Sequence, residues 1–270
     1  MLYGAVIGDI VGSRFEFKHD LTRHKKDFTF FNKTFCHFTD DTVLTAAVAR
    51  AMTLSVSLSD EETKKILISC IKNYYHMYPD AGYGRGFINW AKTNNDLPPY
   101  NSFGNGSAMR CSITGWIYND LKTTMHQAKL TAEITHNHPE GIKGAQATAA
   151  AIYLARNGFE KEDIKDYIEY EFNYNLNKSL EELCISDRTA NSCQVTVPEA
   201  IICFLNANSF EETIRNCVYI GGDTDTLGAI AGAISEAYHG IPKTFIETCN
   251  KYLDDTLYHV IDDINNYFAK

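Results

Sequence analysis

Apolar residues recur at helical spacing along most of the chain, while the alternation typical of strands is rare. Residues 64–78, KKILISCIKNYYHMY, carry apolar side chains at positions 66, 67, 70, 71, 74 and 75, which fall on one face of a helix. Other segments with helical character are 40–52, 140–156, 199–205, 213–220, 224–238 and 243–253. The best extended candidate is the aromatic stretch 28–38, which we expect to form a β-like loop. About a dozen helices joined by short loops predict an all-α fold.

Capping residues and prolines indicate where several of these helices begin and end. Ser59 with Glu62 forms a capping box before 64–78, and Pro79 ends that helix. Ser209 with Glu212 repeats the capping box before 213–220. Proline suits the first turn of a helix, where its missing N–H is not needed. On that basis helix starts are predicted at Pro139, Pro198 and Pro242, with Gly158 following the helix that Pro139 opens.

Small residues are concentrated in three of the helical segments. Glycine occupies positions 4, 8 and 12 in GAVIGDIVG and positions 228 and 232 in GAIAGAI, and 140–156 is rich in alanine. Each glycine costs a helix about 1 kcal/mol relative to alanine. Close approach of neighbouring backbones offsets that cost, so these helices are predicted to lie at the centre of a compact multi-helix orthogonal bundle.

Composition and charge limit the class of protein. The 270 residues are 44% hydrophobic and 22% charged, as in ordinary globular proteins, and no linker-like segment divides them, so one domain over 1–270 is expected. The net charge of −9 argues against direct binding of nucleic acid. No apolar run reaches the ~18 residues of a membrane span, and Asp9 interrupts the apolar N-terminus, so we expect no membrane segment and no signal peptide. Eight scattered cysteines indicate reduced core thiols in a cytoplasmic protein.

Two short polar clusters precede helices whose bodies are apolar. Thr39, Asp40 and Asp41 come directly before TVLTAAVARAM, and the segment 223–226, which contains two aspartates and two threonines, comes before LGAIAGAISEAY. Each cluster offers two carboxylates and a hydroxyl within four residues. One interpretation is helix capping, because aspartate and threonine accept hydrogen bonds from free N–H groups and the helix dipole favours their charge.

The second carboxylate of each cluster is not needed for capping. It adds repulsion between like charges, and burial adds the cost of desolvation. A divalent cation would offset both, and four carboxylates with two hydroxyls suit two ions about 3.5–4 Å apart. Oxygen ligands favour Mg²⁺ or Mn²⁺ over Zn²⁺. Capping and metal binding both account for the clusters at this point.

Six sequence blocks in order, between residue 3 and about residue 242, resemble the ADP-ribosylglycohydrolase family. The blocks are GAVIGDIVGSRFEF, FTDDTVLTAAVA, GYGRGFINWA, SFGNGSAMR, THNHPEGIKGAQATAAAI and GGDTDTLGAIAGAISEAYHGIP. The resemblance implies an all-α fold with a site for two Mg²⁺ or Mn²⁺ ions. It implies as metal ligands the residues Thr39, Asp40, Asp41, Asp223, Asp225 and Thr226.

The resemblance also implies catalytic residues. Family members carry a glutamate on a loop near the metals, which corresponds to Glu16 in SRFEF. On the residues alone, Glu16 reads as a solvated loop carboxylate. The candidates for the general base are Glu16, Asp41 and Asp225, and the sequence does not choose among them.

The family binds the diphosphate of ADP-ribose with the glycine-rich block that here comprises Ser102, Phe103, Gly104, Asn105, Gly106 and Ser107. On its own this block is equally an ordinary Asn-Gly turn, leading into a helix predicted over 107–117. The resemblance further implies ligand contacts for His136, Asp80 and Tyr83, and less directly for His138. A role for Arg110 stays open.

The implied activity is hydrolysis of the bond between C1 of the distal ribose of ADP-ribose and an acceptor. That acceptor is a protein side chain, with arginine favoured, or a small molecule. Two alternatives remain: a two-metal phosphohydrolase acting on a nucleotide, and a relative that binds ADP-ribose without catalysis. The polar segment 160–195 is less family-like, and we expect it to shape the acceptor side.

Overall fold

The computed structural model describes residues 1–17, 26–93, 97–185 and 190–268, and these residues form helices and loops without a strand. The helices, in chain order, are α1 (Tyr3–Ser13), α2 (Asp40–Leu54), α3 (Asp60–Met77), α4 (Arg85–Ala91), α5 (Gly106–Met109), α6 (Thr114–Ile117), α7 (Leu121–Glu133), α8 (Pro139–Arg156), α9 (Lys161–Phe172), α10 (Leu180–Ile185), α11 (Cys193–Leu205), α12 (Phe210–Ile220), α13 (Thr224–His239), α14 (Lys243–Cys249) and α15 (Asp255–Phe268). The predicted all-α class is confirmed.

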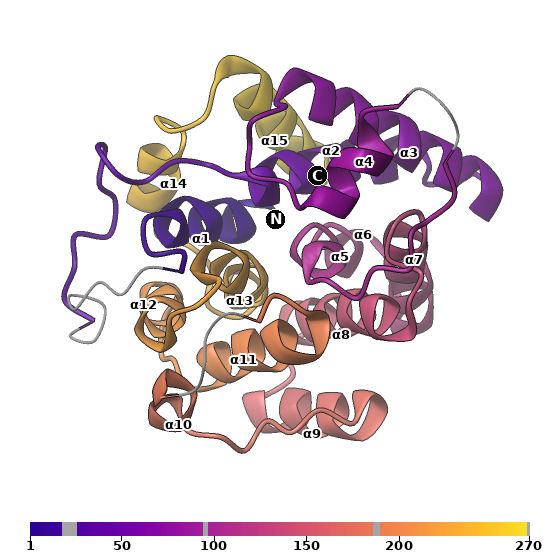
Figure 1. Ribbon diagram of the computed structural model, residues 1–270. Helices are drawn as coiled ribbons and strands as arrows, with labels where there is room; N and C mark the ends of the chain where they lie inside the picture. Colours follow the sequence, from indigo (N-terminus) through magenta and orange to yellow (C-terminus); the bar gives the residue numbers. More distant parts are fainter. Residues whose placement is uncertain (18–25, 94–96, 186–189, 269–270) are drawn as a thin grey trace.

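Helices α1 and α13 pack against each other more closely than any other pair of helices described (Figure 1). A Cβ atom at Gly8 would lie 1.9 Å from the carbonyl oxygen of Gly228, and one at Gly4 would lie 2.2 Å from that of Gly232. The two backbones therefore touch directly, and a side chain at these positions would separate them. The close approach predicted from the glycine spacing is confirmed.

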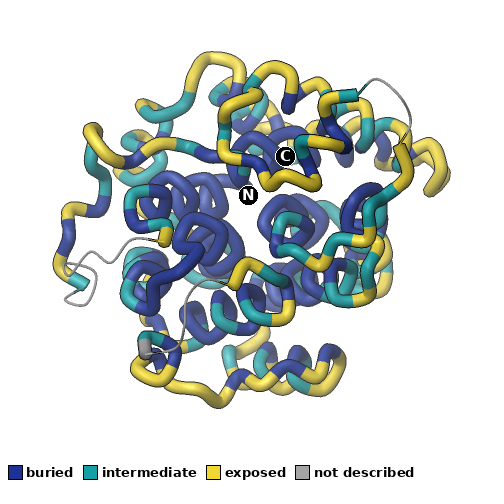
Figure 2. The backbone as a smooth tube through the Cα atoms, in the orientation of Figure 1, coloured by how far each residue is buried: buried dark blue, intermediate teal, exposed yellow. Residues whose placement is uncertain are grey.

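The centre of the bundle is almost free of solvent contact, as the dark-blue tube of Figure 2 shows. Every residue of α1 is buried, and so is each residue of α13 from Thr224 to Ser235. Helix α8 contributes its alanine-rich face to the same interior. The polar residues that open α2 and α13 are consequently held by a rigid apolar body.

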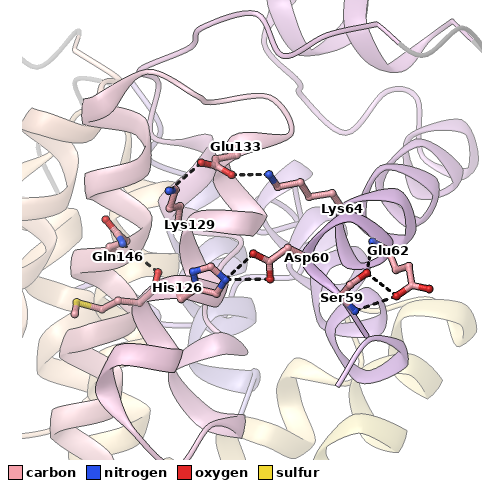
Figure 3. A network of polar contacts seen from close by, with 9 residues as sticks. Ser59, Asp60, Glu62, Lys64, His126, Lys129, Glu133 and Gln146 are labelled. Carbon is pink, nitrogen blue, oxygen red and sulfur yellow. Dashed lines mark hydrogen bonds and ion pairs between the residues drawn. The ribbon is translucent and has the colours of Figure 1, made fainter. Parts of the chain in front are cut away.

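The capping box at the start of α3 is present as predicted. The Ser59 hydroxyl accepts from the Glu62 amide, and the Glu62 carboxylate accepts from the Ser59 amide. Figure 3 shows this box beside the contacts that join α3 to α7, including the pair between His126 and Asp60. At α12 the Ser209 cap forms, but the Glu212 carboxylate accepts from the Asn208 amide, so the second box is not reciprocal.

Three local predictions are corrected by the structure. Helix α11 begins at Cys193 and carries Pro198 inside it, five residues after the first helical residue. The helix predicted over 107–117 is divided into α5 and α6, with a break at 110–113. The aromatic stretch 28–38 forms turns and bends, and Phe30 stacks on Phe245 of α14 with ring centroids 4.8 Å apart.

The predicted helix starts at Pro139 and Pro242 are close to the observed ones, because Pro139 is the first residue of α8 and Pro242 the N-cap of α14. All eight cysteines are free thiols, as expected. Within the described ranges, no helix combines the length and apolar character that crossing a membrane requires.

Candidate metal centre and ligand pocket

One cavity of about 530 Å³ collects most of the residues singled out from the sequence. Its lining includes residues that follow α1, the start of α2, the loop between α4 and α5, and the turn before α13. The lining contains a group of carboxylates, called the acidic end below, and the loop 102–106, called the glycine-rich end. The described lining residues used below are Glu16, Asp40, Asp41, Gly104, Asn105, Gly106, Arg110, His136, Asp223, Asp225 and Thr226.

Carboxylates from three separate parts of the chain form the acidic end. Asp40 and Asp41 open α2, and Asp223 and Asp225 open α13. Glu16 follows α1, and its carboxylate lies within 4.8 Å of carboxylate oxygens of Asp223 and Asp225. These three side chains could hold a metal ion.

The two clusters read from the sequence meet directly. The Thr226 hydroxyl donates to Oδ2 of Asp41 over 3.3 Å, although 185 positions separate them. The Thr39 hydroxyl lies 3.5 Å from the same oxygen. The α1–α13 packing produces this meeting, because α13 carries one cluster and α1 contacts the residues that begin α2.

Burial and mutual repulsion disfavour the ionised state of these carboxyl groups. Desolvation, with the charges of Asp9, Asp223 and Glu16, raises the pKa of Asp40 to about 8. Desolvation and neighbouring carboxylates also raise the pKa values of Asp41 and Asp225 well above the usual range. A cation bound among them would reverse this effect, since it favours the charged form.

The donor set fits a hard divalent cation. Oδ1 of Asp41 is buried and has no hydrogen-bond partner among the described residues. An unsatisfied buried carboxylate oxygen is costly unless an ion or water completes it. The atoms at this end of the cavity are carboxylate and hydroxyl oxygens, which suit Mg²⁺ or Mn²⁺.

Capping explains only part of the two clusters. Thr39 is the N-cap of α2 and accepts from the Asp41 amide. Asp223 is the N-cap of α13, yet its side chain makes no capping bond. It accepts instead from the side-chain nitrogen Nδ2 of Asn105 at 2.7 Å. The Asp225 carboxylate accepts from the next amide, that of Thr226. Capping of α13 therefore does not explain why two aspartates stand at its start.

Sequence reasoning missed Asp9, which it treated only as an interruption of an apolar run. Asp9 is fully buried in α1 and accepts from the amide and hydroxyl of Thr39 and from the amide and hydroxyl of Thr42. It thus caps α2 from a different helix and fixes the segment that carries Asp40 and Asp41. The sequence feature that could have identified Asp9 is a single charged residue within an apolar helical segment.

Asn105 joins the glycine-rich end to the acidic end. Besides Asp223, its side-chain nitrogen donates to the Thr196 hydroxyl. Ser102 accepts from the Gly104 amide, which tightens the turn. Phe103 is 49% exposed at the rim and packs against the ring of His138. This arrangement presents an aromatic face and a narrow glycine-lined floor.

Three residues expected at the ligand lie outside the cavity lining. The Ser107 hydroxyl is fully buried and donates to the carbonyl of Gly141. Tyr83 is buried and stacks on Phe87, and Asp80 is exposed. Gly82 and Gly84 line the cavity at that position instead. His136 does line it, while residues 186–189 of the segment expected to shape the acceptor side lie outside the described residues.

The fold matches that of a solved structure described as "ADP-ribosylglycohydrolase-related protein complex", with a TM-score of 0.68 and 21% identity over 95% of this chain and 92% of the other. The two chains therefore share an all-helical fold. Residues 1–270 match the family model for ADP-ribosylglycohydrolase, so the chain belongs to that family.

Relatives of known name agree with this membership. The chain is 27% identical over 325 aligned positions to ADP-ribosylhydrolase ARH3 of Homo sapiens, covering 93% of this chain and 88% of the relative. It is 24% identical over 262 positions to ADP-ribosylarginine hydrolase Tri1 of Pseudomonas putida, covering 89% and 70%. The expected family is confirmed.

Proposed function

We propose that the protein is a metal-dependent hydrolase that releases ADP-ribose from an ADP-ribosylated acceptor. The observation that carries the proposal is the meeting of two carboxylate clusters and Glu16 in one cavity that a glycine-rich loop also lines. A ligand that has both vicinal hydroxyls and a diphosphate matches these two groups of lining residues. The named relatives are ADP-ribosylhydrolases, which supports the same class.

We assign the metal ligands as two sets around two Mg²⁺ or Mn²⁺ ions: Thr39, Asp40, Asp41, Asp223, Asp225 and Thr226. Metal ions held by these residues would supply Lewis-acid chemistry, making bound water more acidic and favouring a fixed orientation of the substrate. The buried Oδ1 of Asp41, which lacks a partner among the described residues, supports this assignment. Asn105 holds Asp223 in place from the ligand loop.

Bond cleavage in this proposal needs a base for the water that attacks C1 of the distal ribose. Water attacks C1 and gives one proton to the base, the bond from C1 to the acceptor atom breaks with its electron pair going to that atom, and the departing acceptor atom takes up a proton in turn. Glu16 is the base we assign, because its carboxylate is partly exposed and lies within 4.8 Å of carboxylate oxygens of both Asp223 and Asp225. Asp41 and Asp225 stabilise the positive charge that develops on the ribose.

The glycine-rich loop holds the diphosphate and adenosine side. Gly104 and Gly106 leave room for oxygen atoms beside His136, and Phe103 offers an exposed ring at the rim. Arginine is the acceptor we propose, and the proposal is supported by the relative Tri1, whose name is ADP-ribosylarginine hydrolase.

The direct test is incubation with arginine-linked, serine-linked and polymeric ADP-ribose, with Mg²⁺, Mn²⁺ or a chelator. We expect free ADP-ribose from the arginine conjugate, and loss of that release with the chelator. Release of inorganic phosphate or a nucleoside monophosphate would replace the proposal by a phosphohydrolase. Binding of ADP-ribose without turnover of any conjugate would indicate a relative that has lost catalysis.

A further inference from the structure

Arg110 is a buried cation that has no role in the proposed reaction. It follows α5 beneath the glycine-rich loop and is 0% exposed. Its Nη2 donates to the carbonyl of Thr131 and to the hydroxyl of Thr135, at 2.9 and 2.7 Å. Within the described ranges no carboxylate pairs with it, and its Nε and Nη1 have no partner. Burying a cation without a paired anion is destabilising.

The Thr135 hydroxyl connects Arg110 to His136 through hydrogen bonds. Its oxygen accepts from Arg110 and lies 2.7 Å from Nδ1 of His136. A hydroxyl has one proton to donate, and Nδ1 is the one hydrogen-bond partner of this hydroxyl, among the described residues, that is able to accept it. When Thr135 donates to Nδ1, the single proton of the neutral imidazole must lie on Nε2.

The doubly protonated imidazolium does not fit this position. A proton on Nδ1 would leave the Thr135 proton without an acceptor among the described residues. Burial, together with the charge of Arg110, also lowers the pKa of His136 well below its usual range. The other ring facing His136 is Tyr100, with centroids 5.9 Å apart. Burial lowers the pKa of Arg110 only to about 10, so its charge persists at neutral pH.

Nε2 of His136 faces the floor of the ligand loop. A Cβ at Gly106 would lie 3.2 Å from this nitrogen, and one at Gly104 would lie 3.7 Å from it. Because both positions are glycine, the space beside Nε2 is open to the cavity that His136 lines. A proton on Nε2 therefore makes the ring a donor toward an oxygen of a bound ligand.

We propose that Arg110 and Thr135 are positioning residues that hold His136 in the tautomer with its proton on Nε2, so that it serves as a fixed hydrogen-bond donor to a ligand oxygen above Gly104 and Gly106. The ligand in this inference is the one of the proposed function, and the tautomer itself is a property of the free protein. The tautomer of His136 and the proposed function can therefore be refuted independently of each other.

The first measurement is the ring-nitrogen NMR spectrum of the ligand-free protein labelled with ¹⁵N-histidine, with His136→Asn used to assign the signals. We expect the Nε2-protonated pattern in the wild type. Thr135→Val removes the donor to Nδ1 and shifts the population toward Nδ1 protonation, whereas Thr135→Ser keeps the wild-type pattern. A wild-type ring protonated on Nδ1, or a Thr135→Val ring unchanged from wild type, would overturn the proposal.

The second measurement is calorimetry with free ADP-ribose, which needs no turnover. We expect Thr135→Val to weaken binding about ten-fold, the loss of one hydrogen bond, and Thr135→Ser to restore it. Thr131→Val is the matched control, because its hydroxyl donates only within its own helix, to the carbonyl of Ala128. Equal weakening in Thr131→Val would assign the effect to general destabilisation and contradict the positioning role. Failure to release ADP-ribose from conjugates would refute the proposed function and leave the tautomer result standing.

Discussion

Replacing Gly8 by alanine tests whether the contact between α1 and α13 builds the acidic site. The added Cβ would lie 1.9 Å from the Gly228 carbonyl oxygen, while real Cβ atoms essentially never approach other atoms closer than 3.0 Å. The helices must therefore move apart by about 1 Å, since neither backbone can rotate away as a side chain would. Asp9 on α1 and Asp225 on α13 move with their helices.

The magnitude follows from two opposing effects. Overpacking in a close-packed interior costs about 3 kcal/mol at the upper end, and alanine returns about 1 kcal/mol of helix propensity. The net destabilisation of about 2 kcal/mol corresponds to a fall of roughly 4–8 °C in Tm for a protein of this size. The moved carboxylates also weaken metal binding, so the stabilisation by added Mg²⁺ or Mn²⁺ shrinks.

The assay is thermal unfolding followed by circular dichroism, with and without the metal ions. Gly84→Ala is the matched control for stability, because its Cβ meets nothing within 4 Å and its φ of −65° suits any residue. We expect Tm of Gly84→Ala to stay near that of wild type. An unchanged Tm in Gly8→Ala, or an equal fall in both variants, would refute the packing argument.

Three further predictions concern the acidic end. Asp41→Ala and Asp225→Ala should each lose at least about 100-fold in ADP-ribose release with metal supplied; wild-type turnover in either folded variant, checked by circular dichroism, would remove that residue from the site. The folded-state pKa of Asp40 is raised to about 8, so protonation of Asp40 stabilises the metal-free protein, and this stability is lost as pH rises from about 4 toward 8. The Tm of the protein with chelator should fall over that interval and recover with Mg²⁺. A Tm that rises with pH would show the sign to be wrong. Asp9→Asn should lower metal affinity about ten-fold by loosening the start of α2, measured by calorimetry; unaltered affinity together with lowered Tm would limit Asp9 to a structural role.

Local rules predicted the helices well where the signal lay in adjacent residues. The Ser59 capping box and Pro139 at the start of α8 depend on residues a few positions apart, so the sequence contains the whole determinant. The helix start predicted at Pro198 was wrong, because there the local signal did not decide the boundary. Pro198 lies in the second turn of a helix begun by Cys193, and the tertiary packing of α11 overrides the boundary signal.

The candidate site also has some features that the local sequence determines and others that depend on tertiary packing. The sequence by itself determined the helical class, the glycine spacing that lets α1 touch α13, and the two carboxylate clusters, because charge and periodicity are properties of short segments. Only the tertiary structure decided that Asp9 caps a helix other than its own, that Ser107, Asp80 and Tyr83 lie outside the cavity lining, and that Arg110 reaches His136 through Thr135. Those contacts join atoms from different helices, and the direction of each side chain depends on how whole helices pack, which no local pattern encodes.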